Sequence, residues 1–217
     1  MADIQRRPLP SRVYAIVDAE IAARANWRVP DLADAYLQAG VRILQIRAKD
    51  AAARDVLAWT EAVARLAGEA WVIVNDRVDI ALVAGTRHVH LGQDDLPIPE
   101  ARALLGAGAV IGLSTHTAAQ LDTACREPLD YIAVGPVFGT RTKATGYEAV
   151  GLAAVRRAHT AAQAAGVPLV AIGGITLDTA PEVIAAGASA VAVITDLLCG
   201  ASPGARARAY VERLSRV

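Results

Sequence analysis

Two hydrophobic patterns alternate along the chain, and each favours one type of secondary structure. Short apolar runs rich in Val and Ile are typical of buried strands, whereas longer stretches with apolar residues every three or four positions are typical of helices. Glycine or proline lies at many of the boundaries. The pattern predicts strands over residues 12–18, 41–47, 71–74, 110–114, 131–138, 169–172 and 190–194, with one more directly before Gly92. It predicts helices over residues 30–40, 51–66, 78–85, 98–105, 117–126, 152–165, 178–186 and 205–214.

The order of these elements predicts the fold class. Eight strands alternate with eight helices in 217 residues, and a strand–helix–strand unit connects parallel strands through a right-handed crossover. We therefore predict an α/β fold, a single (β/α)8 TIM barrel over residues 1–217, with residues 1–10 as a flexible N-terminal segment. A doubly wound parallel sheet is the alternative.

Composition narrows the classes of function. Hydrophobic residues make up 54% of the chain and aromatic residues 4%, so Ala, Val, Leu and Ile must build the core. The 22 basic and 22 acidic residues give a formal net charge of zero, which argues against a broad surface for nucleic acid or membrane. Cys125 and Cys199 form no CxxC motif, so neither a disulfide framework nor a zinc site is expected. With neither a signal peptide nor a membrane-spanning run in the pattern, we expect a soluble, cytoplasmic protein, and a homo-oligomer stays open.

Two carboxylates follow neighbouring predicted strands. Asp76 comes just after the strand 71–74, beside Asn75, and Asp95 follows the next strand. Because the carboxyl ends of adjacent parallel strands lie at the same edge, these carboxylates can share a hard cation such as Mg²⁺, which takes few protein ligands and completes its shell with waters and substrate phosphates. The alternative is that Asp76 caps the following helix and Asp95 lies in a polar loop.

A basic cluster ends the strand 41–47. The period of two places Gln45, Arg47 and Lys49 on one face. Arg47 offers a bidentate fork and Lys49 a mobile point charge, a combination suited to pyrophosphate. Gln45 and Arg47 continue the face of Ile43, so they point toward the barrel mouth if that face is interior. The alternative is a strand end whose charges reach solvent.

The fifth predicted strand ends in Ser114-Thr115-His116-Thr117. Ser114 is a candidate hydrogen-bond donor to a phosphate, and His116 is a candidate for proton transfer near neutral pH. Thr115 and Thr117 are better explained as helix-capping residues.

Two histidines, His88 and His90, share one face of the fourth predicted strand, and without a third ligand nearby they do not indicate a zinc pair. His90 is expected to hold Asp95 or a substrate in place, or to be a core histidine with satisfied hydrogen bonds. Tyr14 and Trp27 are candidates to line a ligand pocket, with a core position for Tyr14 and a surface position for Trp27 as the alternatives.

Two further loops have the composition of anion-binding segments. Residues 139–146 are rich in hydroxyls and basic groups and are flanked by glycines, which is typical of a lid that closes on phosphates and also of a solvated loop. Gly173-Gly174 and Ile194-Thr195 follow the seventh and eighth strands, where many barrels bind phosphate through backbone N–H groups. A tight turn explains the two glycines equally well when they are taken alone.

Together these residues indicate two anion sites at one barrel mouth. A reaction that releases pyrophosphate and joins two small molecules would use both. A Mg²⁺-pyrophosphate site would comprise Gln45, Arg47, Lys49, Asn75, Asp76, Asp95 and Lys143, and a monophosphate site would comprise Gly174, Ile194 and Thr195.

Five ordered motifs resemble the successive signatures of the thiamine phosphate synthase family, and they cover essentially the whole barrel. They are QIRAK at residues 45–49, VNDRVD at 74–79, VHLGQDD at 89–95, GPVF at 135–138 leading to TRTK at 140–143, and IGGI at 172–175. The resemblance implies condensation of hydroxymethylpyrimidine pyrophosphate with a thiazole phosphate, giving thiamine monophosphate and pyrophosphate.

The resemblance also implies a role for each site residue. Asp76 and Asp95 would bind Mg²⁺, and Arg47, Ser114 and Lys143 would act on the leaving pyrophosphate. The pyrimidine pyrophosphate would be held by Gln45, Arg47, Lys49, Asn75, Ser114 and Lys143. The thiazole phosphate would be held by Thr140, Arg141, Thr142, Gly174, Ile194 and Thr195.

Three positions depart from the family pattern, namely Ala48 in place of an acidic residue, Gly139 in place of proline and Thr195 in place of serine. None of them removes an expected ligand. One alternative is a thiazole tautomerase on the same barrel, with His116 as the acid–base residue, but that reaction would leave the pyrophosphate-site residues without a ligand. The other is a non-catalytic barrel that binds phosphates of the thiamine pathway.

Overall fold

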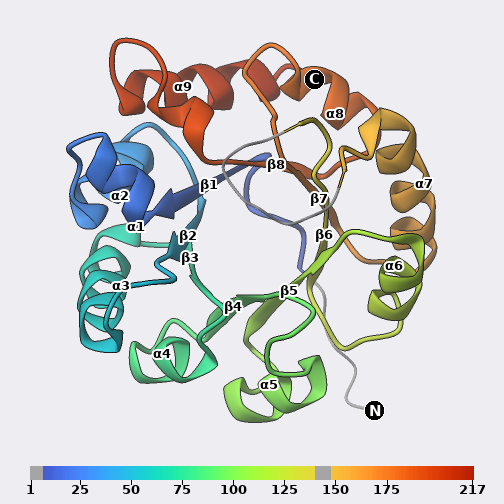
Figure 1. Cartoon of the computed structure of the whole chain (residues 1–217), viewed down its shortest axis with the longest axis horizontal. Helices are drawn as coiled ribbons and strands as arrows, with labels where there is room; N and C mark the ends of the chain where they lie inside the picture. Colours follow the sequence, from blue (N-terminus) through green and yellow to red (C-terminus); the bar gives the residue numbers. More distant parts are fainter. Residues whose placement is uncertain (1–6, 140–147) are drawn as a thin grey trace.

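The structure, a computed structural model, describes residues 7–139 and 148–217. Eight parallel strands pair in sequence order and close into a barrel, and helices form a ring around it (Figure 1). The pairing of the first strand with the last confirms the predicted TIM barrel and excludes the doubly wound sheet. The strands are β1 (Val13–Asp18), β2 (Ile43–Arg47), β3 (Trp71–Asn75), β4 (His88–Leu91), β5 (Val110–Thr115), β6 (Tyr131–Val134), β7 (Leu169–Ile172) and β8 (Ala190–Val193).

The helices follow the predicted order, with two additions. The described helices are α1 (Ala19–Arg24), α2 (Val29–Gln38), α3 (Ala53–Ala67), α4 (Val78–Val83), α5 (Ile98–Leu105), α6 (Ala118–Ala124), α7 (Gly151–Ala164), α8 (Ala180–Ala185), α9 (Pro203–Leu214) and the 3₁₀ helix η1 (Thr195–Leu198). Within the described part of the chain, no helix has both the length and the apolar character needed to cross a membrane.

The additions and one shortened strand have local causes. Helix α1 lies in the segment expected to be a simple connection, and the Asp18 side chain caps it by accepting from the Ile21 N–H at 3.1 Å. Helix η1 directly follows β8. Strand β6 ends at Val134 rather than at residue 138, because Pro136 has no N–H to donate to a neighbouring strand.

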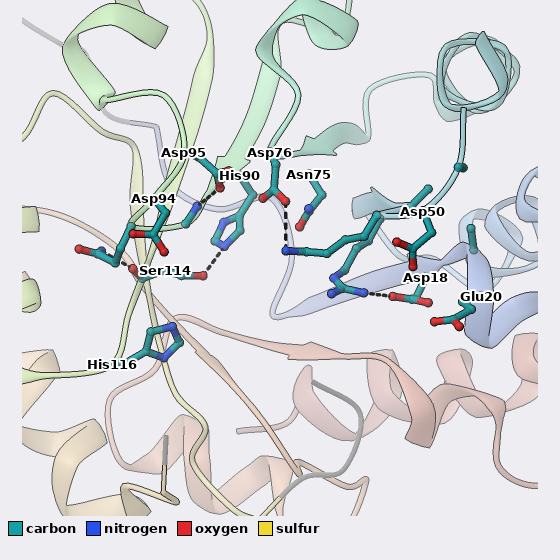
Figure 2. A pocket seen from close by; sticks show the side chains of 17 residues that line it. Asp18, Glu20, Asp50, Asn75, Asp76, His90, Asp94, Asp95, Ser114 and His116 are labelled. Atoms are coloured by element: carbon teal, nitrogen blue, oxygen red, sulfur yellow. Dashed lines mark hydrogen bonds and ion pairs between the residues drawn. The ribbon is translucent and has the colours of Figure 1, made fainter. Parts of the chain in front are cut away.

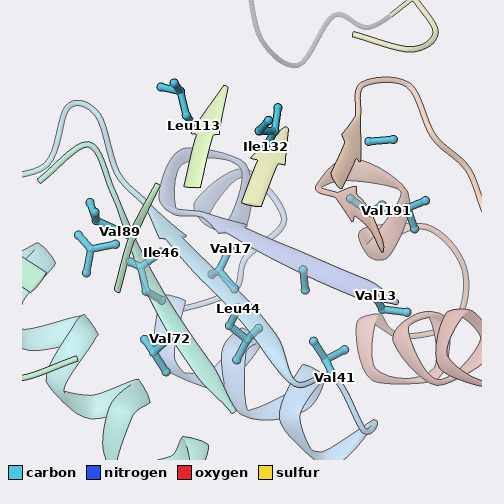
Figure 3. Close-up of a cluster of buried hydrophobic side chains, with 14 of the residues drawn as sticks. Val13, Val17, Val41, Leu44, Ile46, Val72, Val89, Leu113, Ile132 and Val191 are labelled. Atoms are coloured by element: carbon cyan, nitrogen blue, oxygen red, sulfur yellow. The ribbon is translucent and has the colours of Figure 1, made fainter. Parts of the chain in front are cut away.

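The strands separate two cores. On β1, Val13 and Val17 face the helices and belong to the outer cluster that Figure 3 shows. Tyr14 and Ile16, at the alternate positions, belong to a second cluster inside the barrel. Ile43 belongs to this inner cluster as well, so the face of β2 that continues to the predicted anion-binding residues is interior.

The barrel interior is unevenly filled. Tyr131 projects inward from β6 and is fully buried, whereas Ala133 on β6 and Ala192 on β8 are small. Gly112 on β5 leaves the space that the Tyr131 ring occupies, since a Cβ atom there would overlap the ring. The small side chains leave room near the carboxyl ends of β6 to β8, and Gly112 fixes where the Tyr131 ring lies.

Gly112→Ala is therefore expected to destabilise the fold by about 1–3 kcal/mol, because the added methyl group must displace a buried ring. Gly108→Ala is the matched control: an added Cβ at Gly108 meets no described atom within 4 Å, and its effect should stay within about 0.5 kcal/mol. Urea unfolding of the two variants and the wild type measures the difference. Equal unfolding midpoints for the two variants would contradict the proposed overlap.

Candidate active site

A cavity of about 710 Å³ lies at the carboxyl ends of strands β1 to β5. Most of the residues predicted for the pyrophosphate site line it, and they come from the ends of successive strands (Figure 2). These are Arg47, Lys49, Asn75, Asp76, Asp95 and Ser114, and the same wall includes Asp18, Glu20, Asp50, His90, Asp94 and His116. The structure thus brings together side chains that the sequence spreads over nearly a hundred residues.

Arg47 is held by a carboxylate that sequence analysis did not select. Its Nη1 donates to Oδ2 of Asp18, and the two side chains are 15% and 4% exposed. The alternative of a charge that reaches solvent is therefore wrong for Arg47. Its Nε atom is buried and has no hydrogen-bond partner among the described residues. A ligand oxygen at this position would satisfy that N–H, which is costly to leave unpaired in a buried site.

Asp76 lies in the left-handed backbone region, with φ 63°, and its N–H donates to the His90 carbonyl at 2.9 Å. Its carboxylate lies 3.6 Å from Nζ of Lys49 (Figure 2). Helix α4 begins at Val78, with Arg77 at the capping position and no side-chain cap. The alternative of Asp76 as a helix cap is therefore wrong, and its side chain belongs to the cavity wall.

Asp95 closes the loop after β4. Its Oδ2 accepts the Gly92 N–H at 2.7 Å, so the polar-loop interpretation holds for this oxygen while the residue still lines the cavity. Over the described residues, six carboxylates but only two cationic side chains, Arg47 and Lys49, line the cavity. An anionic ligand would meet net negative charge there unless a cation accompanied it.

The donor set around this cavity suits a magnesium ion that shares its shell with a ligand. In the described ranges, no three His, Cys, Asp or Glu side chains cluster closely enough to form a metal site from protein ligands alone. Mg²⁺ does not require such a cluster, since it commonly uses one or two carboxylates together with waters and phosphate oxygens. Asp76 and Asp95, two hard oxygen ligands on one cavity wall, fit that pattern.

Gln45 and His90 lie deeper than the other predicted residues. Gln45 is 2% exposed and lines a small cavity of about 20 Å³ with Arg47 and His90. His90 is buried, and its ring nitrogens contact the Tyr131 hydroxyl at 2.9 Å and Ser114 Oγ at 2.8 Å. His90 is therefore a histidine with both ring nitrogens hydrogen-bonded, as one of the two expectations had it. His88 faces the interior further from the mouth, where burial lowers the pKa of its ring.

A second cavity, of about 170 Å³, lies at the carboxyl ends of β6 to β8. The residues predicted to bind a monophosphate, Gly174, Ile194 and Thr195, all line it. Ser114 and His116 line both cavities, so the two candidate anion sites meet at the end of β5. His116 is oriented there by its Nδ1–H, which donates to the Gly135 carbonyl at 2.6 Å.

An ion-pair cluster holds Asp196, one of the residues that line the second cavity. The carboxylate of Asp196, in η1, accepts three hydrogen bonds from Arg206 at 2.9 to 3.1 Å, one from the Tyr210 hydroxyl and one from the Leu177 N–H. Burial and the bond to Asp196 raise the pKa of the Tyr210 hydroxyl. The cluster ties the loops after β7 and β8 to α9, and so holds the backbone beside Thr195.

Four predicted site residues, Thr140, Arg141, Thr142 and Lys143, lie outside the described residues. Tyr14 is buried inside the barrel. Trp27 is half-buried, packs against the outer core and lines neither of these two cavities. The interior position of Tyr14 matches the alternative that sequence analysis kept open.

Sequence analysis missed Asp18 and Asp196 as members of the site. Asp18 ends a predicted strand just as Asp76 does, so the same signal was present but unused. Asp196 follows directly on Ile194-Thr195, but nothing in the local pattern pairs it with Arg206 ten residues later.

The sequence comparisons with known proteins agree on one family. A family model described as thiamine monophosphate synthase matches residues 13–197. A thiamine-phosphate synthase from Anaeromyxobacter dehalogenans is 46% identical over 81% of this chain and 78% of its own length. Another from Mycobacterium sp. (strain KMS) is 40% identical over 96% of this chain and 98% of its own length. Some relatives are longer, and the chain covers 53% of one from Synechococcus sp. (strain WH7803).

Among solved structures, a thiamine phosphate pyrophosphorylase from Pyrococcus furiosus superimposes with a TM-score of 0.82. It is 26% identical, and the match covers 94% of this chain and 96% of that protein. The sequence and structure comparisons therefore agree over nearly the full barrel.

Asp18→Asn is expected to lower the free energy of unfolding by about 3 kcal/mol, because it leaves the Arg47 charge buried without its counter-ion. Asparagine keeps the volume and an oxygen that can still cap α1. Glu20→Gln is the matched control, since Glu20 lines the same cavity but pairs with Arg24 at the surface, where the side chains are 65% and 72% exposed. Its effect should stay below about 1 kcal/mol. Urea unfolding measures both, and a loss at Asp18 no larger than that at Glu20 would show that the buried pair contributes little.

Proposed function

The chain belongs to the thiamine monophosphate synthase family, and from this membership we propose that it condenses 4-amino-2-methyl-5-hydroxymethylpyrimidine pyrophosphate with thiazole phosphate. The products would be thiamine monophosphate and pyrophosphate. The observation that carries the proposal is the meeting of a cation-bearing cavity and a glycine-lined cavity at Ser114 and His116. Two phosphorylated molecules bound in these cavities would have their reacting ends side by side.

The larger cavity would take the pyrimidine pyrophosphate. Arg47, fixed by Asp18, can present its buried Nε–H to a ligand oxygen, and the half-exposed Lys49 can turn from Asp76 to a phosphate. Asn75 and Ser114 add hydrogen-bonding groups on the same wall. Gln45 would contribute from beneath the cavity, and the family resemblance assigns Lys143 to the same ligand.

Magnesium fits this site through Asp76 and Asp95, where it would neutralise charge on the pyrophosphate and help it to leave. Arg47, Lys49 and Lys143 would stabilise the same developing charge from the protein side. As the bond between the pyrimidine methylene carbon and the pyrophosphate oxygen breaks, its electron pair stays with the pyrophosphate. The electron-rich aminopyrimidine carries the resulting positive charge.

The smaller cavity would take the thiazole phosphate. Gly174, with φ 64°, has no side chain to keep a phosphate from the backbone, and Ile194 and Thr195 line the same cavity. The family resemblance assigns Thr140, Arg141 and Thr142 to the same substrate. The thiazole nitrogen then attacks the pyrimidine methylene carbon, so no protein side chain has to act as a nucleophile, and positioning of the two substrates carries much of the catalysis.

Pyrophosphate release tests the proposal. Purified protein given both substrates and Mg²⁺ should release pyrophosphate in step with thiamine phosphate, and neither substrate alone should support release. Asp76→Asn should lower kcat/KM by at least about 100-fold, because it removes a charged ligand from the pyrophosphate site. Asparagine tolerates the left-handed backbone of this position, so the fold should be kept.

Asp79→Asn is the matched control, three residues away on the exposed side of α4 and paired there with Arg77. It should keep wild-type activity. Absence of release by folded wild-type protein would refute the synthase proposal. Proton exchange into a thiazole carboxylate phosphate without any pyrimidine substrate would instead establish the tautomerase.

A further inference from the structure

A line of hydrogen-bonded side chains crosses the barrel interior beneath the proposed active site. Gln45 Nε2 donates to the Tyr14 hydroxyl at 2.5 Å, and the hydroxyls of Tyr14 and Tyr131 lie 2.9 Å apart. The Tyr131 hydroxyl lies 2.9 Å from Nδ1 of His90. Nε2 of His90 lies 2.8 Å from Ser114 Oγ at the cavity wall (Figure 2). The line therefore joins five strands and ends where the two cavities meet.

The chemistry of each group sets a direction along this line. An amide nitrogen only donates, so the Tyr14 oxygen accepts from Gln45 and its proton is available for Tyr131. The opposite arrangement, with Tyr131 donating to Tyr14, would leave the buried Tyr14 proton with no acceptor among the described residues. Unpaired buried donors are rare in folded proteins.

The same reasoning continues to the cavity. A Tyr131 hydroxyl that accepts from Tyr14 must donate its own O–H to Nδ1 of His90 as a hydrogen bond. A neutral His90 then carries its proton on Nε2 and donates it to Ser114 Oγ. Since Oγ already accepts this bond, the Ser114 proton remains available for an acceptor in the cavity.

Three other observations support a fixed line. Both phenols are fully buried, and burial raises the pKa of Tyr14 and of Tyr131 above the usual value, so each hydroxyl keeps its proton. The Tyr131 ring stacks on the His90 ring at an interplanar angle of 16°. Gln93 Nε2 donates to the Ser114 carbonyl at 2.6 Å, which holds the backbone of the last residue in the line.

We propose that Tyr14, Tyr131 and His90 are positioning residues. The two tyrosines hold His90 as the Nε2–H tautomer, and His90 in this form sets Ser114 as a hydrogen-bond donor to the bound substrate. Ser114 would offer its proton to an oxygen of the pyrimidine pyrophosphate, an acceptor-only group. The identity of that ligand rests on the proposed function. The direction of the line does not, because it follows from the described side chains.

The tautomer of His90 can be measured without any substrate. Two-bond ¹H–¹⁵N correlation spectra of the wild-type protein in mildly alkaline buffer report which ring nitrogen carries the proton, with the His90 signals assigned from a His90→Gln sample. We expect a protonated Nε2 and an unprotonated Nδ1. A protonated Nδ1 would overturn the proposal, since it would mean that the Gln45 amide is turned over and the line runs in reverse.

A double-mutant cycle tests whether the line acts through Ser114. Ser114→Ala and Tyr131→Phe are each expected to lower kcat/KM for the pyrimidine pyrophosphate by about 10-fold, the size of one lost hydrogen bond to a charged group. The double variant should be no worse than Ser114→Ala alone, because Tyr131 then has nothing left to orient. Multiplicative losses would overturn the proposal and assign Tyr131 a separate, structural effect.

Tyr36→Phe is the matched control, because Tyr36 is also buried but belongs to the outer core on α2. It should leave both the kinetics and the His90 spectrum unchanged. If the wild-type protein has no synthase activity at all, the spectra still decide the direction of the line, so the two proposals can fail separately.

Discussion

The site depends on the narrow interior of a closed barrel. In a strand every second side chain points inward, and eight strands leave only enough space for these side chains to touch. Residues that end β1 to β5 are therefore forced together at one mouth, whatever their distance along the chain. A shift of one residue in any strand would turn its polar side chain toward the helices and its Val or Leu into the mouth. The alternation of hydrophobic residues that specifies the strands therefore also places the polar side chains at the mouth of the barrel.

The two described cations of the larger cavity differ in how firmly they are held, since Arg47 is fixed and Lys49 can move. Arg47 is buried against Asp18, so its guanidinium group is oriented before a ligand binds. The Asp18 carboxylate also offsets part of the attraction of Arg47 for an anion. Lys49 is 53% exposed and lies 3.6 Å from Asp76, a contact weak enough to exchange for a phosphate. A pyrophosphate could therefore draw Lys49 away from the Asp76 carboxylate.

The local sequence pattern was enough to predict most helices and strands, but not which distant side chains contact one another. Residues 98–105 and 169–172 form the predicted helix and strand without change, because periodicity and boundary residues agree there. Periodicity also placed Gln45 and Arg47 on the same face of β2 as Ile43, and the structure shows that this face is interior. It could not pair Tyr14 with Tyr131, 117 residues apart, or Asp18 with Arg47, since those contacts depend on how the barrel closes. The short α1 was missed because its capping residue, Asp18, was assigned only to the end of the preceding strand. Magnesium stays a prediction, because the donor set is suitable but does not by itself identify the ion.

The unequal charge of the larger cavity also bears on the chemistry proposed for it. Six carboxylates beside two described cations would repel a bare pyrophosphate and would favour a positively charged pyrimidine. A cation that enters with the pyrophosphate would remove this repulsion. The attraction for a positively charged pyrimidine would remain, because the other carboxylates would still lie beside the substrate proposed for this cavity. Among the described residues that line the second cavity, the one carboxylate is Asp196, which is paired with Arg206. The two cavities together would therefore suit the proposed reaction, in which positive charge develops on one substrate beside the carboxylates and passes to the nitrogen of the other substrate when that neutral nitrogen attacks.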